Sequence, residues 1–494
     1  MAARFAAGDD ALARMVRDRE DTISRLQWLD GQLISALSLS SEERDDDREE
    51  SVRAEMTLLG ERLAELDEGL GRDFPDYAEI ANPQPVPLSE VQGLLGSEEA
   101  LISFAVWDEF SFMLVVRHDQ AEMFKLAVGT DALRAAVKLL RLYLAPQSLT
   151  GISDLLERGY PGAKAFELYQ ELIAPAEPLL AGVRHLFVVP DGELQSLPLG
   201  VLLTEEPQGD FNDFDVYRRA PWLARKYGIT TLPSVSSLRA LRRYAKSSTA
   251  AKPFIGFGDP LLGPASSNDR GIEISSVFRG HEADLEAIRQ LPSLPETADE
   301  LKNIARSLGG SESAIFLGVD ATEAQVRAAP LAESRVLAFA THALVGGEIE
   351  GAAEPALVLT PPNVATDDDD GLLTASEIAK HLNLDANWVI LSACNTAAGE
   401  TPDAEGLSGL AKAFFYAGSR ALLVSHWPVP SKSAVKLTTG TFAALAADPE
   451  LGRAEALQKS MLALLEDTET DYFAHPFFWA PFVVVGEGGR ISRQ

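Results

Sequence analysis

The sequence predicts an α/β fold with a mostly parallel sheet that helices cover on both faces. Short apolar runs, such as residues 387–391 and 421–425, alternate with stretches of helical periodicity from about residue 250 onward. Apolar runs of this length are typical of parallel strands that are buried on both faces. The 494 residues allow two or three domains of about 100–200 residues each.

Residues 1–80 are expected to form a helical hairpin or short coiled coil that connects to the rest of the chain. Apolar residues recur there at helical spacing, among them Leu58, Leu59, Leu63, Leu66 and Leu70. The charged stretch 41–53 is expected to link the two helices, and Asp73-Phe74-Pro75 to end the second. The alternative is a purely structural arm, because such stripes usually only bury one helix face.

Residues 85–250 are predicted to form the first half of the main body. Strands are expected between residues 100 and 126, helices at about 130–144 and 163–173, and a further strand at 185–189. The turn Pro190-Asp191-Gly192 closes that strand.

Residues 251–494 are predicted to form the second half, with strands and helices in alternation. Strands are expected at 314–317, 387–391 and 421–425, and another that runs up to His342. Thr322 is expected to start a helix. Two capping boxes are predicted at helix starts, one formed by Thr297 with Glu300 and one by Thr374 with Glu377.

The single cysteine of the chain, Cys394, closely follows one apolar run, and His342 follows another. If both runs are parallel strands, the two side chains lie at the edge where open α/β sheets place their chemistry. A thiol attacks well when a neighbouring imidazole takes its proton. The residues therefore indicate a cysteine nucleophile with a histidine base. A buried, inert cysteine is the alternative, and His426 is a second candidate base because it also follows a strand.

Composition excludes several other classes of function. A net charge of −31 repels phosphate backbones and anionic membranes, so we expect no nucleic acid or membrane partner. A basic or neutral protein fits better, and we expect a protein substrate and a regulatory protein partner. We expect no cofactor and no metal, because phosphate-binding glycine loops and zinc-ligand spacings are missing. One cysteine and no apolar run of about 18 residues favour a cytoplasmic location.

Eight blocks in order give the chain a resemblance to the CHAT domain family, a caspase-like cysteine peptidase family related to separase. It covers roughly residues 85–490. The blocks are Val-Pro-Asp-Gly-Glu-Leu at 189–194, Leu-Pro-Glu-Thr-Ala-Asp-Glu at 294–300, Phe-Ala-Thr-His-Ala at 339–343, Leu-Thr-Ala-Ser-Glu-Ile at 373–378, Leu-Ser-Ala-Cys-Asn-Thr-Ala at 391–397, Gly-Leu at 406–407 with Ala-Phe at 413–414, Val-Ser-His-Trp-Pro-Val at 424–429, and His-Pro at 475–476 with Trp-Ala at 479–480.

The resemblance implies a caspase-like fold. Residues 85–250 would be a pseudo-peptidase half and residues 251–494 the catalytic half, with a dyad of His342 and Cys394. Relatives usually carry tetratricopeptide repeats upstream, and residues 1–80 look like the connector that follows them.

The resemblance also implies where the rest of the site lies. Backbone amides at Cys394 and at Ala343, or in the loop to Gly346, would stabilise the oxyanion, and a backbone carbonyl could orient the imidazole. Ser392, just before the cysteine motif, and His426 are candidates for the substrate pocket. Asp403 and Glu405, in the loop after the cysteine, would meet a basic side chain, unless they are ordinary solvated acids.

Two hypotheses of function follow. The first is a cysteine endopeptidase that a partner or ligand activates. The second is a non-enzymatic caspase-like adaptor that binds partners through its helical arm and acidic surface. The presence of both His342 and Cys394 favours the enzyme.

Overall fold

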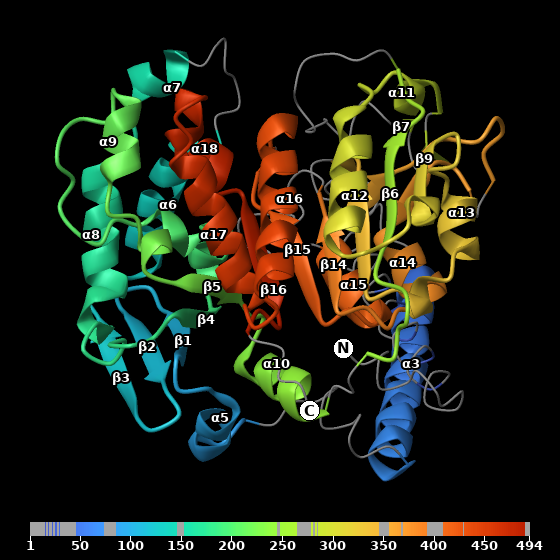
Figure 1. The fold of residues 1–494 in the computed structure, drawn as a ribbon. Helices are drawn as coiled ribbons and strands as arrows, with labels where there is room; N and C mark the ends of the chain where they lie inside the picture. The colour runs from blue at the N-terminus through green and yellow to red at the C-terminus, as the bar shows by residue number, and fades with distance from the viewer. Residues whose placement is uncertain are drawn as a thin grey trace.

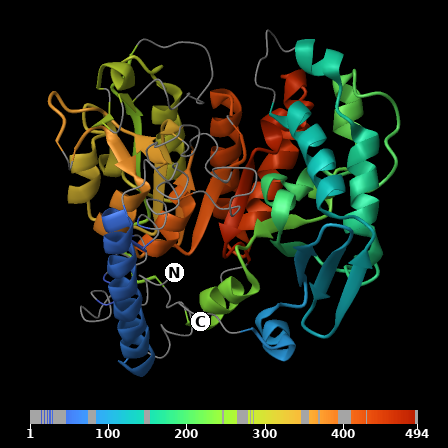
Figure 2. The ribbon, with the colours of Figure 1, turned by 180° about the vertical axis from the view of Figure 1, so that it is seen from behind.

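The computed structural model describes most of the chain (Figures 1 and 2). The described residues are 15, 18, 22, 25, 26, 29, 46–73, 85–145, 153–244, 248–263, 278–279, 282–283, 285–344, 355–366, 369–392, 409–427 and 429–489. Four of the expected site residues, Gly346, Cys394, Asp403 and Glu405, lie outside these ranges.

One eleven-stranded sheet runs through the whole body. In spatial order its strands are β3 (Ala121–Leu126), β2 (Ser111–Val116), β1 (Glu99–Val106), β4 (His185–Val189), β5 (Gly228–Thr231), β16 (Phe482–Gly486), β15 (Ala421–Ser425), β14 (Trp388–Leu391), β10 (Val336–Ala340), β6 (Ile255–Pro260) and β9 (Ile315–Gly318). The mostly parallel sheet that the sequence predicts is therefore confirmed.

The two halves of the sheet run in opposite directions. β1, β4, β5 and β16 are parallel to one another, and so are β15, β14, β10, β6 and β9. The last strand of the chain, β16, lies between β5 and β15 and pairs antiparallel with β15. The carboxyl ends of β10, β14 and β15 consequently meet at one edge of the sheet.

Helices cover both faces of the sheet (Figure 1). One face packs against α6 (Thr130–Leu144), α8 (Gly162–Leu172), α12 (Glu296–Ser307), α16 (Ser431–Ala447), α17 (Arg453–Leu465) and α18 (Pro476–Trp479). The other face packs against α13 (Glu323–Ala328), α14 (Ala375–His381) and α15 (Gly409–Ala417) in the second half, and α5 (Leu88–Leu94) and α10 (Val235–Arg239) in the first.

Several smaller elements complete the body. They are α7 (Ser153–Arg158), α9 (Phe214–Arg219), α11 (Leu285–Arg289), the 3₁₀ turn η2 (Gly192–Ser196), the three-stranded sheet of β11 (Ala343–Leu344), β12 (Ala356–Val358) and β13 (Leu372–Thr374), and the pair β7 (Phe278–Arg279) and β8 (Glu282–Ala283).

Strand β14 shows why these apolar runs become central strands. Trp388 and Ile390 pack into the core beneath α12, α16 and α17, and Val389 and Leu391 into the core beneath α14 and α15. All four side chains are buried. Because side chains alternate across a strand, a strand buried on both faces needs apolar residues at every position.

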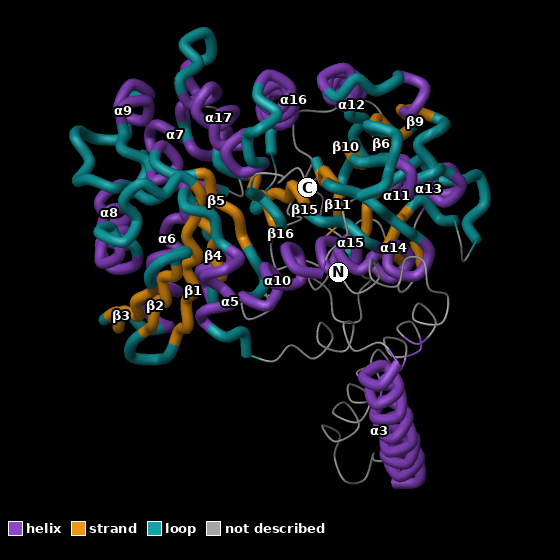
Figure 3. The backbone as a smooth tube through the Cα atoms, turned by 60° about the horizontal axis from the view of Figure 1, so that its bottom comes forward, coloured by secondary structure: helices purple, strands orange, loops and turns teal. Residues whose placement is uncertain are grey.

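Helix α3 (Asp46–Asp73) forms one side of the predicted hairpin (Figure 3). Ion pairs join Arg25 to Glu55 and Arg62 to Asp18, so the earlier segment runs antiparallel to α3. Along α3 the less exposed Val, Met and Leu residues recur at alternating spacings of four and three, which is the heptad pattern of a coiled coil. They are Val52, Met56, Leu59, Leu63 and Leu66.

Two local predictions are wrong. α3 begins at Asp46, so much of the charged stretch 41–53 is helix and not linker. Thr297 and Glu300 form no capping box, since α12 has Pro295 at its N-cap and no side-chain cap. The box of Thr374 and Glu377 is confirmed, and Thr322 caps α13 as predicted.

No helix in the described ranges is long and apolar enough to span a bilayer.

Candidate functional site

His342 lies two residues beyond the end of β10, and its side chain is fully buried. Its Nε2 atom is 2.8 Å from the carbonyl oxygen of Pro292. A carbonyl can only accept a hydrogen bond, so Nε2 carries the proton in this arrangement. In the neutral ring Nδ1 then has the lone pair and can accept a proton.

Neighbouring backbone fixes the Pro292 carbonyl in place. Pro292 lies between α11 and α12, and it pairs with Gly263 in a parallel bridge. The Gly263 amide donates to the Leu291 carbonyl at 2.9 Å. A Cβ on Gly263 would come within 3.0 Å of the Arg289 carbonyl oxygen, so a larger residue there would displace this segment.

Ala343 starts β11, directly after the histidine. Val358 of β12 donates its amide to the His342 carbonyl at 2.9 Å, and Ala343 pairs with Leu357. Opposed residues in an antiparallel ladder alternate between bonded and non-bonded pairs. Since His342 and Val358 are the bonded pair, the Ala343 amide points away from β12 and is not used by this ladder.

The strand that leads to Cys394 lies beside the strand of His342. Each residue of β14 pairs with the residue 52 places earlier in β10, from Val336 with Trp388 to Phe339 with Leu391. Ser392 continues this pairing, because its amide donates to the Phe339 carbonyl at 2.9 Å. Its side chain is buried, and its place in a substrate pocket stays a prediction.

His426 follows β15, at the same edge of the sheet, but its surroundings differ from those of His342. Its amide donates to the Pro481 carbonyl at 2.9 Å, and its own carbonyl accepts from Arg141 at 3.1 Å. Burial of the imidazole, together with the nearby Arg141 guanidinium, lowers the pKa of His426 to about 3. A ring that holds a proton so weakly is a poor general base near neutral pH.

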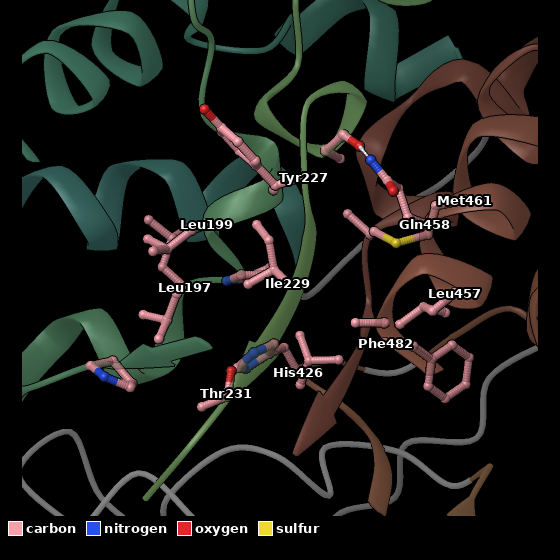
Figure 4. Close-up of a pocket in the computed structure, with 18 of the residues that line it drawn as sticks. Leu197, Leu199, Tyr227, Ile229, Thr231, His426, Leu457, Gln458, Met461 and Phe482 are labelled. Carbon is pink, nitrogen blue, oxygen red and sulfur yellow. Dashed lines mark hydrogen bonds between the residues drawn. The ribbon is translucent and has the colours of Figure 1, made fainter. Parts of the chain in front are cut away.

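His426 also lines a cavity between the first half of the sheet and α17 (Figure 4). Its walls are mainly apolar, with Val188, Leu197, Ile229, Leu457, Met461 and Phe482 among the lining residues. His426 thus lines a cavity, and its role in a substrate pocket stays a prediction.

Two features of this edge are not identified by the sequence. A backbone carbonyl is expected to orient the imidazole, but no sequence signal indicates that it belongs to Pro292, because every residue has a carbonyl. Asp259, near the end of β6, has φ of 43°, a backbone conformation that is uncommon outside glycine and that occurs often at functional sites. Burial, and then the nearby Glu296, raise the pKa of Asp259. The Gly258-Asp259-Pro260 sequence could have indicated an irregular strand end.

No group of three or more His, Cys, Asp or Glu side chains in the described ranges could hold a metal ion.

Known families and proteins show similarity over much of the chain. The model of the CHAT domain matches residues 162–487. Two curated relatives are both named tetratricopeptide repeat protein 28. The mouse protein is 26% identical over 442 residues, which is 78% of this chain and 16% of that protein. The human protein is 25% identical over 382 residues, 66% of this chain and 13% of that protein. The chain thus spans a small part of these relatives.

Two solved structures are also similar to the chain. Separase in the separase–securin complex of Saccharomyces cerevisiae is 10% identical, with 95% of this chain and 38% of that chain covered and a TM-score of 0.47. The Arg-specific cysteine proteinase gingipain R is 11% identical, with 74% and 76% covered and a TM-score of 0.36.

Proposed function

Because the chain belongs to the CHAT domain family, we propose that it is a cysteine endopeptidase with His342 as base and Cys394 as nucleophile. The family resemblance that the sequence predicts is confirmed, and with it the caspase-like class of fold. The observation that carries the proposal is the imidazole of His342, whose Nε2 is bound to the Pro292 carbonyl at 2.8 Å.

The strand register supports the pairing of the two residues. Cys394 is two positions beyond Ser392, as His342 is two positions beyond Ala340. The carboxyl ends of β10 and β14 lie side by side in the sheet, and His342 and Cys394 follow these two strands in the sequence. Adjacent strands lie about 4.8 Å apart, which is close enough for side-chain contact.

The proposed reaction starts with transfer of the thiol proton of Cys394 to Nδ1 of His342. The thiolate attacks the peptide carbonyl carbon, and the resulting oxyanion accepts hydrogen bonds from backbone amides. The Ala343 amide is a suitable donor because it points away from β12. The imidazolium then protonates the leaving amine, and water, deprotonated by the same ring, releases the acyl group from the sulfur.

For the substrate we propose a protein cut after a basic or neutral residue. The net charge of −31 favours basic partners, and Asp403 and Glu405 remain proposed contacts. Asp259 of β6 is a further candidate contact for a basic side chain, because β6 pairs with β10, the strand that leads to His342. We further propose that a regulatory protein or ligand activates the enzyme.

A library-cleavage experiment tests this proposal. The chain is incubated with a mixed peptide library, alone and in cell extract that supplies an activator, and new termini are identified by mass spectrometry. Cys394→Ala should abolish cleavage, and His342→Ala should reduce it by a similar factor because the two act as one unit. His381→Ala, at an exposed position on α14, is the matched control and should cleave like the wild type.

An adaptor without peptidase activity is the second candidate, favoured by one feature of the arm. Leu58 of α3 has 65% of its surface exposed, so the arm presents an apolar side chain on its outer face. If Cys394→Ala keeps every cellular effect of the protein and no library peptide is cut, the adaptor is the correct interpretation.

A further inference from the structure

One residue that lines the cavity of Figure 4 has a buried nitrogen without a hydrogen-bond partner among the described residues. The Nδ1 atom of His426 makes no hydrogen bond to any residue that the structure describes, although 95% of the residue's surface is buried, as its 5% exposure shows. An unpaired nitrogen in the interior is destabilising, because it has lost its hydration without gaining a hydrogen bond. Such groups in native proteins usually meet a water or a ligand.

The size of the cavity limits what can fill it. Its volume is about 50 Å³. A site for a single water needs roughly 10–15 Å³, so the cavity has room for a small group of a few non-hydrogen atoms. This is the size of a branched aliphatic group such as the side chain of leucine.

The walls determine the chemistry of the occupant. Apolar side chains from both halves of the fold surround it, among them Leu197 and Ile229 from the first half and Leu457 and Phe482 from the second. No Asp, Glu, Lys or Arg is among the described residues that line it. Arg141 is near the His426 ring but donates to backbone carbonyls outside the lining, so a charged group would lose its hydration in the cavity without a direct ion pair.

We propose that this cavity is a binding site for a short, uncharged aliphatic group of about four carbon atoms, with a hydrogen-bonding atom at His426. The low pKa of His426 is consistent with this chemistry, because the ring stays neutral. The group can come from a free small molecule or from an aliphatic side chain of a bound peptide. Binding does not depend on the peptidase function proposed above.

The position of His426 connects the cavity with the strand that leads to Cys394. It directly follows β15, which pairs with β14, the strand that leads to Cys394. Arg141 of α6 donates hydrogen bonds to the backbone carbonyls of both His426 and Ser196. An occupant that contacts both halves of the fold can therefore shift the position of the backbone at His426, provided that it binds one position of this segment better than another. This consequence, unlike the binding, rests on the proposed function.

NMR of the whole chain, labelled at its methionine methyl groups, tests the binding. Met461 lines the cavity and is the reporter. We expect isobutanol to shift the Met461 signal with a dissociation constant on the order of millimolar, the range for so small a ligand. Ethylene glycol and isobutyrate should leave the signal unchanged. Stronger binding of isobutyrate than of isobutanol would refute the uncharged class.

A variant that fills the cavity provides the matched control. Ala454 is buried in its wall, and Ala454→Leu adds three carbon atoms, so binding of isobutanol should weaken at least tenfold. If that variant does not fold, Leu457→Ala enlarges the cavity instead, and cyclohexylmethanol should then bind better than isobutanol. Unchanged binding in the folded variant, or a cavity that holds only water at saturating isobutanol, would refute the site.

Capped amino acids distinguish the two sources of the group. If a peptide side chain is the natural occupant, N-acetyl-leucinamide should shift Met461 at least tenfold more strongly than N-acetyl-alaninamide at equal concentration. If isobutanol binds and neither amide does, the occupant is a free small molecule. Since the signal reports binding alone, an inactive enzyme would not affect either result.

Discussion

Replacement of Glu323 by glutamine should remove a large part of the pH dependence of folding stability. Glu323 is fully buried at the start of α13. Its Oε1 atom accepts the backbone amides of Asp370 at 2.9 Å and Gly371 at 2.7 Å, and Arg327 lies 3.2 Å from Oε2. The carboxylate thus anchors the segment before β13, whose partner β12 also pairs with β11 beside His342.

The magnitude follows from the pKa. Burial, and then repulsion from Glu377, raise the pKa of Glu323 from 4.5 to about 7, although the two amides act in the opposite direction. The folded state therefore binds a proton more tightly than the unfolded chain. The resulting stabilisation is complete below pH 4.5 and is lost as the pH rises through 7. At 1.36 kcal/mol for each factor of ten, it amounts to about 3 kcal/mol.

Urea unfolding of wild type and Glu323→Gln at pH values from 5 to 8 measures the effect. Glutamine resembles the protonated acid, so the stability of the variant relative to wild type should rise by about 2–3 kcal/mol between pH 5 and pH 8. Glu333→Gln, at an exposed carboxylate paired with Lys252, is the control and should follow the wild type. If the Glu323→Gln and wild-type curves stay parallel, Glu323 is ionised throughout and the reasoning is wrong.

Three further predictions concern the ion network, the arm and the substrate. Arg242→Met should destabilise the fold by about 3–5 kcal/mol in urea unfolding, because it leaves the buried carboxylates of Glu99 and Glu487 without their shared cation; a loss under 1 kcal/mol would contradict this. Removal of residues 1–72 should change turnover well over a fewfold while the body stays folded; equal turnover of the folded truncation and the full chain, both alone and with an activator, would show a passive arm. Cleavage profiles should favour basic or neutral residues before the cut, and a dominant aspartate preference would refute this expectation.

The central strands could be predicted from the sequence because each is encoded locally. β10, β14 and β15 are continuous apolar runs, and a strand buried on both faces requires apolar residues at every position. The capping box of Thr374 and Glu377 is local in the same way, since both partners lie in one helical turn.

Tertiary contacts explain where the same reasoning fails. Thr297 donates to the Leu294 carbonyl and accepts the Asp259 amide, and Glu300 accepts a hydrogen bond from Thr438 of α16. Both side chains are used in packing α12, so neither caps it, although their spacing fits a capping box. The sequence pattern alone cannot distinguish these two uses.

The candidate site also combines locally encoded features with features that depend on tertiary structure. His342 and Cys394 could be predicted because each follows an apolar run, and His342 lies in the structure at the expected edge of the sheet. The Pro292 carbonyl and the orientation of the Ala343 amide depend on backbone geometry, which residue types do not reveal. The insertion of β16 between β5 and β15 depends on pairing across more than 250 positions between Thr230 and Val484, and short-range periodicity contains no information about it.

Labelling of the single cysteine with a peptide acyloxymethyl ketone tests the dyad most directly. The reagent places an electrophilic carbon where the scissile peptide would lie, and with one cysteine in the chain the mass of the intact protein reports Cys394 alone. We expect labelling of the wild type and of His381→Ala at equal rates, and a rate at least about tenfold lower for folded His342→Ala, because the thiol then lacks the base that takes its proton. Equal rates for His342→Ala and wild type would show that His342 does not activate Cys394, and would contradict the account.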